Sequence, residues 1–207
     1  MSWTTQSFAY GATLQSAAMT ALQDDFTAFA TALSGAPIIL PVALDPSCGF
    51  PIASGTTVYT TSGTVADFTG IPSWAKRIYI SISAVSLSTS GPGKYLALQL
   101  GNSGGIETTG YAGSMYVSGG GTFNHSTYFY IANILGASGG YWNGMVCLAL
   151  LDSSTNTWAV MSHVAVAGPT SNIGGGTKAT SAPLDRVRIT TADGSTFDAG
   201  AINIIYD

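Results

Sequence analysis

The sequence predicts a mainly β protein, an antiparallel β-sandwich of jelly-roll type that is preceded by one N-terminal amphipathic helix. From about residue 57 onward, segments of alternating polar and apolar residues recur between glycine-rich turns. The spacing typical of an amphipathic helix is found in one segment, residues 13–35. A chain of 207 residues is also long enough for one β domain with a sizeable core.

The helix is expected over TLQSAAMTALQDDFTAFATALSG, residues 13–35. Thr13 is a suitable N-cap, and Gly35 followed by Pro37 is a suitable end. Five large apolar side chains follow one another at intervals of 3, 4, 3 and 4 residues, the a/d seam of a coiled coil: Met19, Leu22, Phe26, Phe29 and Leu33. The same stripe also suits a helix that packs on the core of its own domain, so the seam leaves that alternative open.

The next segment, residues 36–56, is expected to be an extended linker between the helix region (1–35) and the β domain (57–207). Four of the eight prolines fall there, at positions 37, 41, 46 and 51, and proline favours extended backbone. A lone helix of about 20 residues is marginal in water. Burying the five seam side chains offers on the order of 10 kcal/mol per chain before entropy is subtracted. We therefore expect the helix to join copies of the chain, while the pattern alone does not choose between dimer and trimer.

The β domain is expected to hold about eight strands. The clearest is 77–87, where Ile78, Ile80 and Ile82 alternate with polar positions. Six further segments are predicted as strands: 95–100, 126–135, 145–152, 156–167, 186–190 and 201–207. Turns rich in glycine are predicted at 88–94, 101–110, 118–122, 136–140 and 171–178.

Charged residues make up only 8% of the chain, and its mean hydropathy is +0.32. The longest apolar runs, such as 145–151, are far below the roughly 18 residues of a membrane span, so no membrane insertion is expected. Six basic and ten acidic residues leave no basic stripe for phosphates, which argues against nucleic-acid binding. The first basic residue is Lys76, so a positive secretory n-region is missing. With so few charges, the surface must be covered by Ser, Thr, Asn and Gly or be partly buried against other chains, and both alternatives suit a component of an assembly.

No metal site and no cofactor are predicted. The two histidines, His125 and His163, have no cysteine or carboxylate at metal-ligand spacing, although a ring placed on a symmetry axis would be an exception. The two cysteines, Cys48 and Cys147, lie in unrelated contexts without a CxxC motif. Cys147 is expected to act as a small hydrophobe, and a disulfide between the two remains an open alternative.

Signatures of catalysis are weak. Residues 101–105, GNSGG, match the G-x-S-x-G nucleophile pattern, with Asp152 and His163 downstream, but no helix is expected after them. Residues 136–140 match the same pattern, which shows how readily a chain rich in Gly and Ser produces it. Glycan cleavage needs two facing carboxylates, and the candidates all lie in or beside turns: Glu107, Asp152, Asp185, Asp193 and Asp198. A non-enzyme is therefore expected.

Binding is the chemistry that remains. Aromatic residues in glycine-rich segments can present flat rings to a sugar or to a partner surface. The candidates are Tyr111, Tyr116, Phe123, His125, Tyr128, Tyr141 and Trp142. The alternative is that half or more of these rings belong to the core or to a subunit interface. Trp74 and Trp158 lie in strand-like contexts and are expected in the core.

Three parts of the sequence carry a resemblance to a known family. They are the N-terminal W-x-x-Q-S-F-x-Y-G with LQSAAMTALQDDF, the central FTGIPSWAKRIYISISAVS with LQLGNSGGIETTGY, and the ending DRVRITTADGSTFDAGAINIIYD. Together they resemble the short tail fibres and receptor-binding appendage proteins of tailed bacteriophages and prophages.

The resemblance implies a homotrimeric virion protein, made in the cytoplasm of the host bacterium. Its N-terminal region would attach to other virion proteins, and its β domain would bind a glycan or protein of the host cell surface. Two alternatives are a decoration or connector protein with a purely structural role and, less in keeping with the sequence, a polysaccharide-degrading enzyme.

Overall fold

A computed structural model describes residues 52–89, 93–134, 140–166 and 170–207. These residues form two antiparallel β-sheets, without a helix among them. All the strands belong to one compact unit, Ala53–Asp207. The predicted helix over 13–35, its seam and nearly all of the predicted linker lie outside the described residues. Within the described ranges, no helix is long and apolar enough to cross a membrane.

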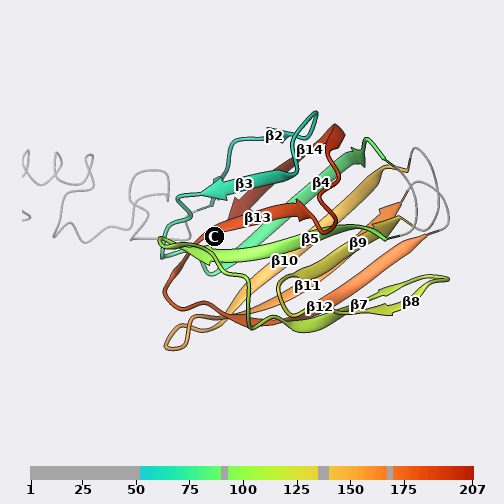
Figure 1. Ribbon diagram of the computed structural model, residues 1–207. Helices are drawn as coiled ribbons and strands as arrows, with labels where there is room; N and C mark the ends of the chain where they lie inside the picture. The colour runs from blue at the N-terminus through green and yellow to red at the C-terminus, as the bar shows by residue number, and fades with distance from the viewer. Residues whose placement is uncertain (1–51, 90–92, 135–139, 167–169) are drawn as a thin grey trace, which may run out of the picture. The chain divides into compact units, whose positions relative to one another are not determined.

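The larger sheet has nine strands in the order β1-β14-β4-β10-β11-β12-β7-β8, with β2 also paired to β14 (Figure 1). All its pairings are antiparallel. The bounds are β1 Ala53–Ser54, β2 Val58–Tyr59, β4 Arg77–Leu87, β7 Ala112–Val117, β8 Gly121–Phe123, β10 Trp142–Asp152, β11 Thr157–Val166, β12 Ser171–Ala179 and β14 Phe197–Tyr206.

The smaller sheet has five strands in the order β3-β13-β5-β6, with β9 also paired to β5. These strands also pair antiparallel, and Figure 1 shows them as a second layer over the larger sheet. The bounds are β3 Val65–Thr69, β5 Lys94–Asn102, β6 Gly105–Ile106, β9 Phe129–Ile134 and β13 Leu184–Thr191. The arrangement is consistent with a β-sandwich.

A single hydrophobic core joins the two sheets. Ile78 and Ile80 of β4 are fully buried on the larger sheet, and Leu96, Leu98 and Leu100 of β5 are fully buried on the smaller one. Each alternates with a residue on the opposite face, because successive side chains of a strand point in opposite directions. Burial of each such side chain contributes about 1.5–3 kcal/mol. The apolar residues that produce the alternation in the sequence are therefore also the main source of stability.

Most strand predictions are confirmed. Predicted strand 77–87 is β4, and the predicted segments 95–100 and 186–190 lie inside β5 and β13. The predicted segment 156–167 corresponds to β11. Trp158 is in the core, as expected, while Trp74 is partly buried against it.

The predicted turn over 171–178 is wrong, because this segment is strand β12. Three glycines lie in the middle of the strand and pair with their neighbours in regular register. A Cβ on Gly176 would lie 2.3 Å from the carbonyl oxygen of Ala112 and 2.6 Å from the Cα of Gly113. These glycines therefore allow a close approach of neighbouring strands.

The predicted turn at the GNSGG motif is confirmed. Asn102 ends β5 and Gly105 begins β6, so the motif forms the tight connection of a β-hairpin. A nucleophile elbow requires a helix at this point, and β6 occupies it. Ser103 is an exposed residue of that turn. In the second match, 136–140, only Gly140 belongs to the described residues.

Candidate functional site

Five aromatic rings form a connected group, here called the aromatic surface: Tyr95, Phe123, His125, Tyr128 and Tyr130. His125 stacks on Tyr128 with ring centroids 4.2 Å apart and planes 9° from parallel. Tyr130 meets Tyr128 edge-on at 5.0 Å and lies 4.4 Å from Tyr95. Phe123 extends the group, with its ring 5.5 Å from that of Tyr95. Such tilted and stacked arrangements are the favoured geometries of aromatic pairs.

The strand pattern explains why these rings gather on one side. On β5 the core residue Leu96 points inward, so its neighbour Tyr95 points away from the core. On β9 the core residues Phe129 and Ile131 point inward, which turns Tyr130 outward. The two strands are paired, with Ala97 opposite Tyr130. Tyr95 and Tyr130 therefore lie on the outer face of the smaller sheet, while Phe123 ends β8 of the larger sheet and His125 and Tyr128 lie in the loop between β8 and β9.

The loop between β8 and β9 fixes the orientation of the His125 ring. Its Nδ1 accepts the backbone N–H of Thr127 at 3.3 Å and lies 2.7 Å from Thr127 Oγ1. These contacts and the stacking on Tyr128 hold an exposed ring in one place. A ring that is already held loses less conformational entropy when a ligand binds.

The edges of the aromatic surface offer neutral hydroxyl groups. The hydroxyls of Tyr128 and Tyr130 lie 3.3 Å apart. Burial raises the pKa of Tyr130 above its ordinary value, and burial together with the neighbouring Tyr130 raises the pKa of Tyr95. Both phenols are therefore protonated at neutral pH. A surface of flat rings with neutral donors and acceptors suits a sugar, which presents apolar C–H faces and hydroxyl groups.

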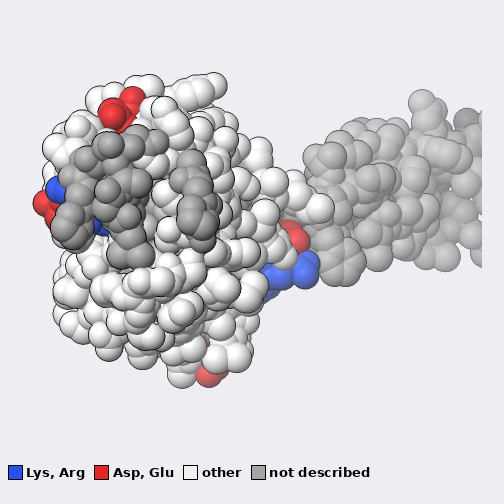
Figure 2. Space-filling model, turned by 90° about the vertical axis from the view of Figure 1, so that its right-hand side faces the viewer, with Lys and Arg blue, Asp and Glu red and all other residues white. Residues whose placement is uncertain are grey.

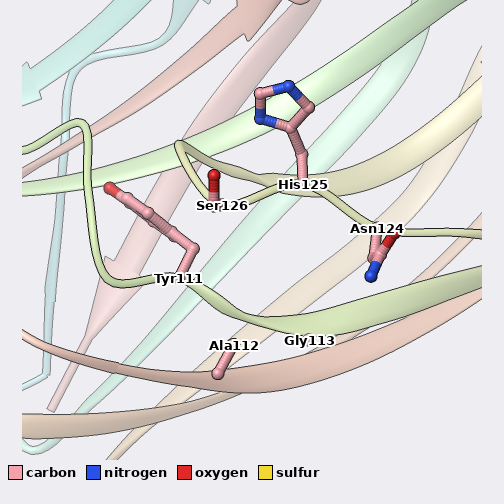
Figure 3. A pocket seen from close by; sticks show the side chains of 6 residues that line it. All are labelled: Tyr111, Ala112, Gly113, Asn124, His125 and Ser126. Carbon is pink, nitrogen blue, oxygen red and sulfur yellow. The ribbon is translucent and has the colours of Figure 1, made fainter.

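An open hollow of about 430 Å³ adjoins this surface (Figure 3). It is lined by Tyr111, Ala112, Gly113, Asn124, His125 and Ser126. In Figure 3 the His125 ring points away from Ala112 and Gly113. The backbone N–H of Tyr111 donates to the Ser126 carbonyl at 3.3 Å, which ties the two walls together. Backbone and small polar groups thus lie next to the rings, as in many binding sites for small polar ligands.

The structure places the seven predicted binding residues in different environments. Phe123, His125 and Tyr128 belong to the aromatic surface. Tyr116 and Tyr141 are exposed, at 54% and 44%, but outside the ring contacts that define this surface. These two remain candidates for other contacts.

For Tyr111 and Trp142 the structure corrects the interpretation as surface binding residues. Trp142 is 0% exposed and Tyr111 is 6% exposed, and both belong to the hydrophobic core. Trp142 begins β10 between its ladder partners Val85 and Val166. The Tyr111 hydroxyl is used internally, since it donates to the Glu107 carbonyl at 2.8 Å and accepts the Leu100 N–H at 2.8 Å. Neither ring is available to a ligand at the surface.

The sequence interpretation missed Tyr95 and Tyr130, which connect the other rings. Both lie within predicted strands, whereas the candidate binding residues were sought in glycine-rich segments. Period-2 alternation from Leu96 and from Phe129 places each of them on the outer face. What alternation does not give is the pairing of β5 with β9, which brings the two rings together.

In the described part of the chain, each carboxylate considered for catalysis has its own hydrogen-bond or ion-pair partners. Asp152 accepts hydrogen bonds from Ser154 and Thr155 in its own turn. The others pair as Glu107 with Lys178, Asp185 with Arg186, Asp193 with Lys94, and Asp198 with Ser86. No two of these five share a partner among the described contacts. Among the same residues, no group of three or more possible metal ligands occurs.

No family model, curated protein or solved structure matches this chain. The assignment of a function therefore rests on the chain's own residues and on the family resemblance noted from its sequence.

Proposed function

We propose that the protein is a non-enzymatic virion appendage of a tailed bacteriophage, a tail fibre or tail-tip protein that attaches the particle to the host surface through its β domain. The observation that carries the proposal is the aromatic surface, in which His125 stacks on Tyr128 at an exposed position. The family resemblance of the sequence supplies the biological context.

The proposed ligand is a glycan of the bacterial surface. Aromatic rings bind the C–H faces of sugars largely independently of salt, and few charges compete for this role in the chain. Most of the face visible in Figure 2 is neither acidic nor basic. A single site of this kind is weak, so the proposal includes a homotrimer in which three sites gain avidity through effective concentration.

The remaining parts of the proposal concern assembly. The helix predicted over 13–35 forms the trimeric bundle, and the region 1–35 attaches to other virion proteins. The β domain has jelly-roll topology. The protein is made in the cytoplasm of the host bacterium and is incorporated into the virion.

Replacing Tyr128 with alanine is expected to weaken glycan binding about tenfold, because the stacked ring beneath His125 is lost. The measurement is binding of the full chain to an array of bacterial O-antigens, capsules and teichoic acids. Tyr59→Ala is the matched control, since Tyr59 is 73% exposed on β2, at the opposite end of the larger sheet from β8, and should leave binding unchanged. Equal binding by the two variants would contradict the assignment of the aromatic surface.

Replacing Phe26 with aspartate is expected to dissociate the assembly, because a charge in an apolar seam is costly to bury. Light scattering should give the mass of a trimer for the native chain and of a monomer for the variant. Asp25→Asn is the control, since position 25 lies outside the seam. An unchanged mass for Phe26→Asp would assign assembly to the β domain alone.

A second candidate is a decoration or connector protein that touches only other virion proteins. The observation in its favour is a run of exposed apolar side chains on the outer face of the larger sheet, which includes Met145, Met161 and Ile173. Neighbouring strands bring Met161 opposite Cys147 and Ile173 opposite His163. This candidate predicts many copies per particle and no glycan binding in the array.

A further inference from the structure

Three polar side chains from both sheets meet at one buried point: Lys178, Glu107 and Asn102. Lys178 belongs to β12 of the larger sheet, and Asn102 ends β5 of the smaller one. Lys178 lies directly opposite Trp158 in the β11–β12 ladder, and Trp158 is a core residue, so the lysine side chain is directed to the same inner face. Glu107, the only glutamate in the sequence, follows β6 and lies between the other two.

The burial of this group is unusual for its chemistry. Lys178 is 4% exposed and Asn102 is 7% exposed. The ring of Tyr111 covers the lysine, with Nζ 5.4 Å from the ring centroid. Lysine is almost never fully buried unless it is paired, and a buried ion pair contributes little stability over an apolar core of the same volume. The arrangement therefore calls for a reason beyond stability of the ion pair.

Glu107 contacts both of the other side chains at once. One carboxylate oxygen, Oε2, accepts from Lys178 Nζ, and the other, Oε1, accepts from Asn102 Nδ2 at 2.8 Å. Burial raises the pKa of Glu107, but hydrogen bonds from Lys178 and Ser181 outweigh it and hold the pKa below its ordinary value. The group thus starts as a charged pair, with the amine and the carboxamide on the two oxygens of one carboxylate.

The carbonyl oxygen of the same carboxamide is also engaged. Asn102 Oδ1 accepts the backbone N–H of Gly104 at 2.8 Å. A backbone N–H in this position polarises the carbonyl and stabilises negative charge that develops on its oxygen. The Lys178 amine is therefore a potential nucleophile, and Glu107 is a proton carrier that contacts both this amine and the leaving Nδ2. The Gly104 N–H is the oxyanion donor. These are the parts required for acyl transfer.

We infer that Lys178 and Asn102 form an intramolecular amide bond, an isopeptide cross-link, with Glu107 as the proton carrier. Glu107 takes a proton from the Lys178 ammonium, and the free amine attacks Cγ of Asn102. The negative charge on Oδ1 is stabilised by the Gly104 N–H. Glu107 then delivers its proton to Nδ2, the Cγ–Nδ2 bond breaks and ammonia leaves. Lys178 loses a second proton when the amide forms. The departing ammonia takes up this proton and leaves as ammonium, so atoms and charge balance.

The reaction takes place once per molecule and needs no co-reactant. Because Glu107 and Lys178 begin as a charged pair, the first proton transfer is uphill, and we expect the bond to form slowly after folding. The product ties β12 of the larger sheet to β5 of the smaller one. The charged amine of Lys178 becomes a neutral amide, and the Glu107 carboxylate keeps its hydrogen bonds from the Ser181 N–H and hydroxyl. This inference is independent of what the aromatic surface binds.

The test is a tryptic digest of the denatured full chain, followed by mass spectrometry. Trypsin does not cleave after an acylated lysine, and no other Lys or Arg lies between Lys94 and Arg186. The cross-linked protein should give one fragment, residues 95–186, lighter than its sequence mass by about 17 Da, one ammonia. Separate fragments 95–178 and 179–186 at full sequence mass would overturn the inference.

Variants distinguish the cross-link from loss of ammonia by an asparagine alone. Glu107→Gln keeps a side chain of the same size but cannot take a proton from Lys178 and deliver it to Nδ2, so it should restore cleavage after Lys178 and the full mass. Lys94→Arg is the matched control at another lysine paired with a carboxylate, and it should keep the uncleaved, lighter fragment. A mass deficit accompanied by normal cleavage after Lys178 would assign the loss to a succinimide and overturn the cross-link.

Discussion

Replacing Trp142 with alanine is expected to lower the free energy of unfolding by about 3–5 kcal/mol, the usual range for a buried tryptophan. The ring is 0% exposed at the start of β10, between Val85 of β4 and Val166 of β11. Its Nε1 has no hydrogen-bond partner in the described part of the chain, so the loss comes from packing and from the cavity that remains.

Urea denaturation of the full chain, followed by circular dichroism, measures this effect. The control is Tyr141→Ala, which removes a neighbouring ring that is 44% exposed and should change stability by about 0.5 kcal/mol or less. Trp142→Phe keeps most of the side-chain volume, so its loss of stability should lie between those of Trp142→Ala and Tyr141→Ala. If Trp142→Ala weakened glycan binding but left the urea midpoint unchanged, the ring would be a surface binding residue after all.

The long strands could be predicted because one face of each is buried. Ile78, Ile80 and Ile82 alternate with Tyr79 and Ser81, and this period identifies β4 as a strand with one buried face. Nothing in such a pattern states which strand lies beside which. The neighbours of β4 are β10 and β14, both far away in sequence, and they are fixed by long-range packing in the folded chain.

Among the strands that escaped prediction, β7 and β12 were missed because glycine has two uses. In β12, Gly174, Gly175 and Gly176 are typical of a turn in sequence but provide space between strands in the structure. In β7, Gly113 has the same role opposite Gly176. The local sequence does not distinguish the two uses, because the difference lies in a neighbouring strand that is distant along the chain.

The candidate binding residues were predicted because they are aromatic and lie in glycine-rich segments, and not from their place in the alternation of a strand. His125, Tyr128 and Phe123 were found because they follow a glycine run, and the same criterion wrongly included Trp142. Alternation from the core residues Val146 and Leu148 places position 142 on the inner face, which was a usable signal. The roles of Lys178 and Asn102 had no signal in the sequence, because they depend on the meeting of two sheets.

The pair formed by Gly113 and Gly176 leads to the last prediction, that Gly176→Ala destabilises the β domain by about 2–3 kcal/mol. Three atoms lie too close to the added Cβ: the Ala112 carbonyl oxygen at 2.3 Å, the Gly113 Cα at 2.6 Å and Phe129 Cε1 at 2.8 Å. Two of these are backbone atoms, so the strands themselves must separate. The lower entropy of alanine in the unfolded chain offsets only about 0.4–1 kcal/mol of that cost.

Gly175→Ala is the control, because it lies in the same strand and its Cβ meets one close atom, the Val160 carbonyl oxygen at 2.9 Å. Urea denaturation should therefore show a clearly larger loss for Gly176→Ala. Phe129 gives a second measurement, since it packs on the glycine pair and precedes Tyr130 of the aromatic surface. Displacement of Phe129 should weaken glycan binding in Gly176→Ala but not in Gly175→Ala. Equal stability of the two variants would mean that β7 and β12 have room to part without strain, and that the glycine pair does not position the rings.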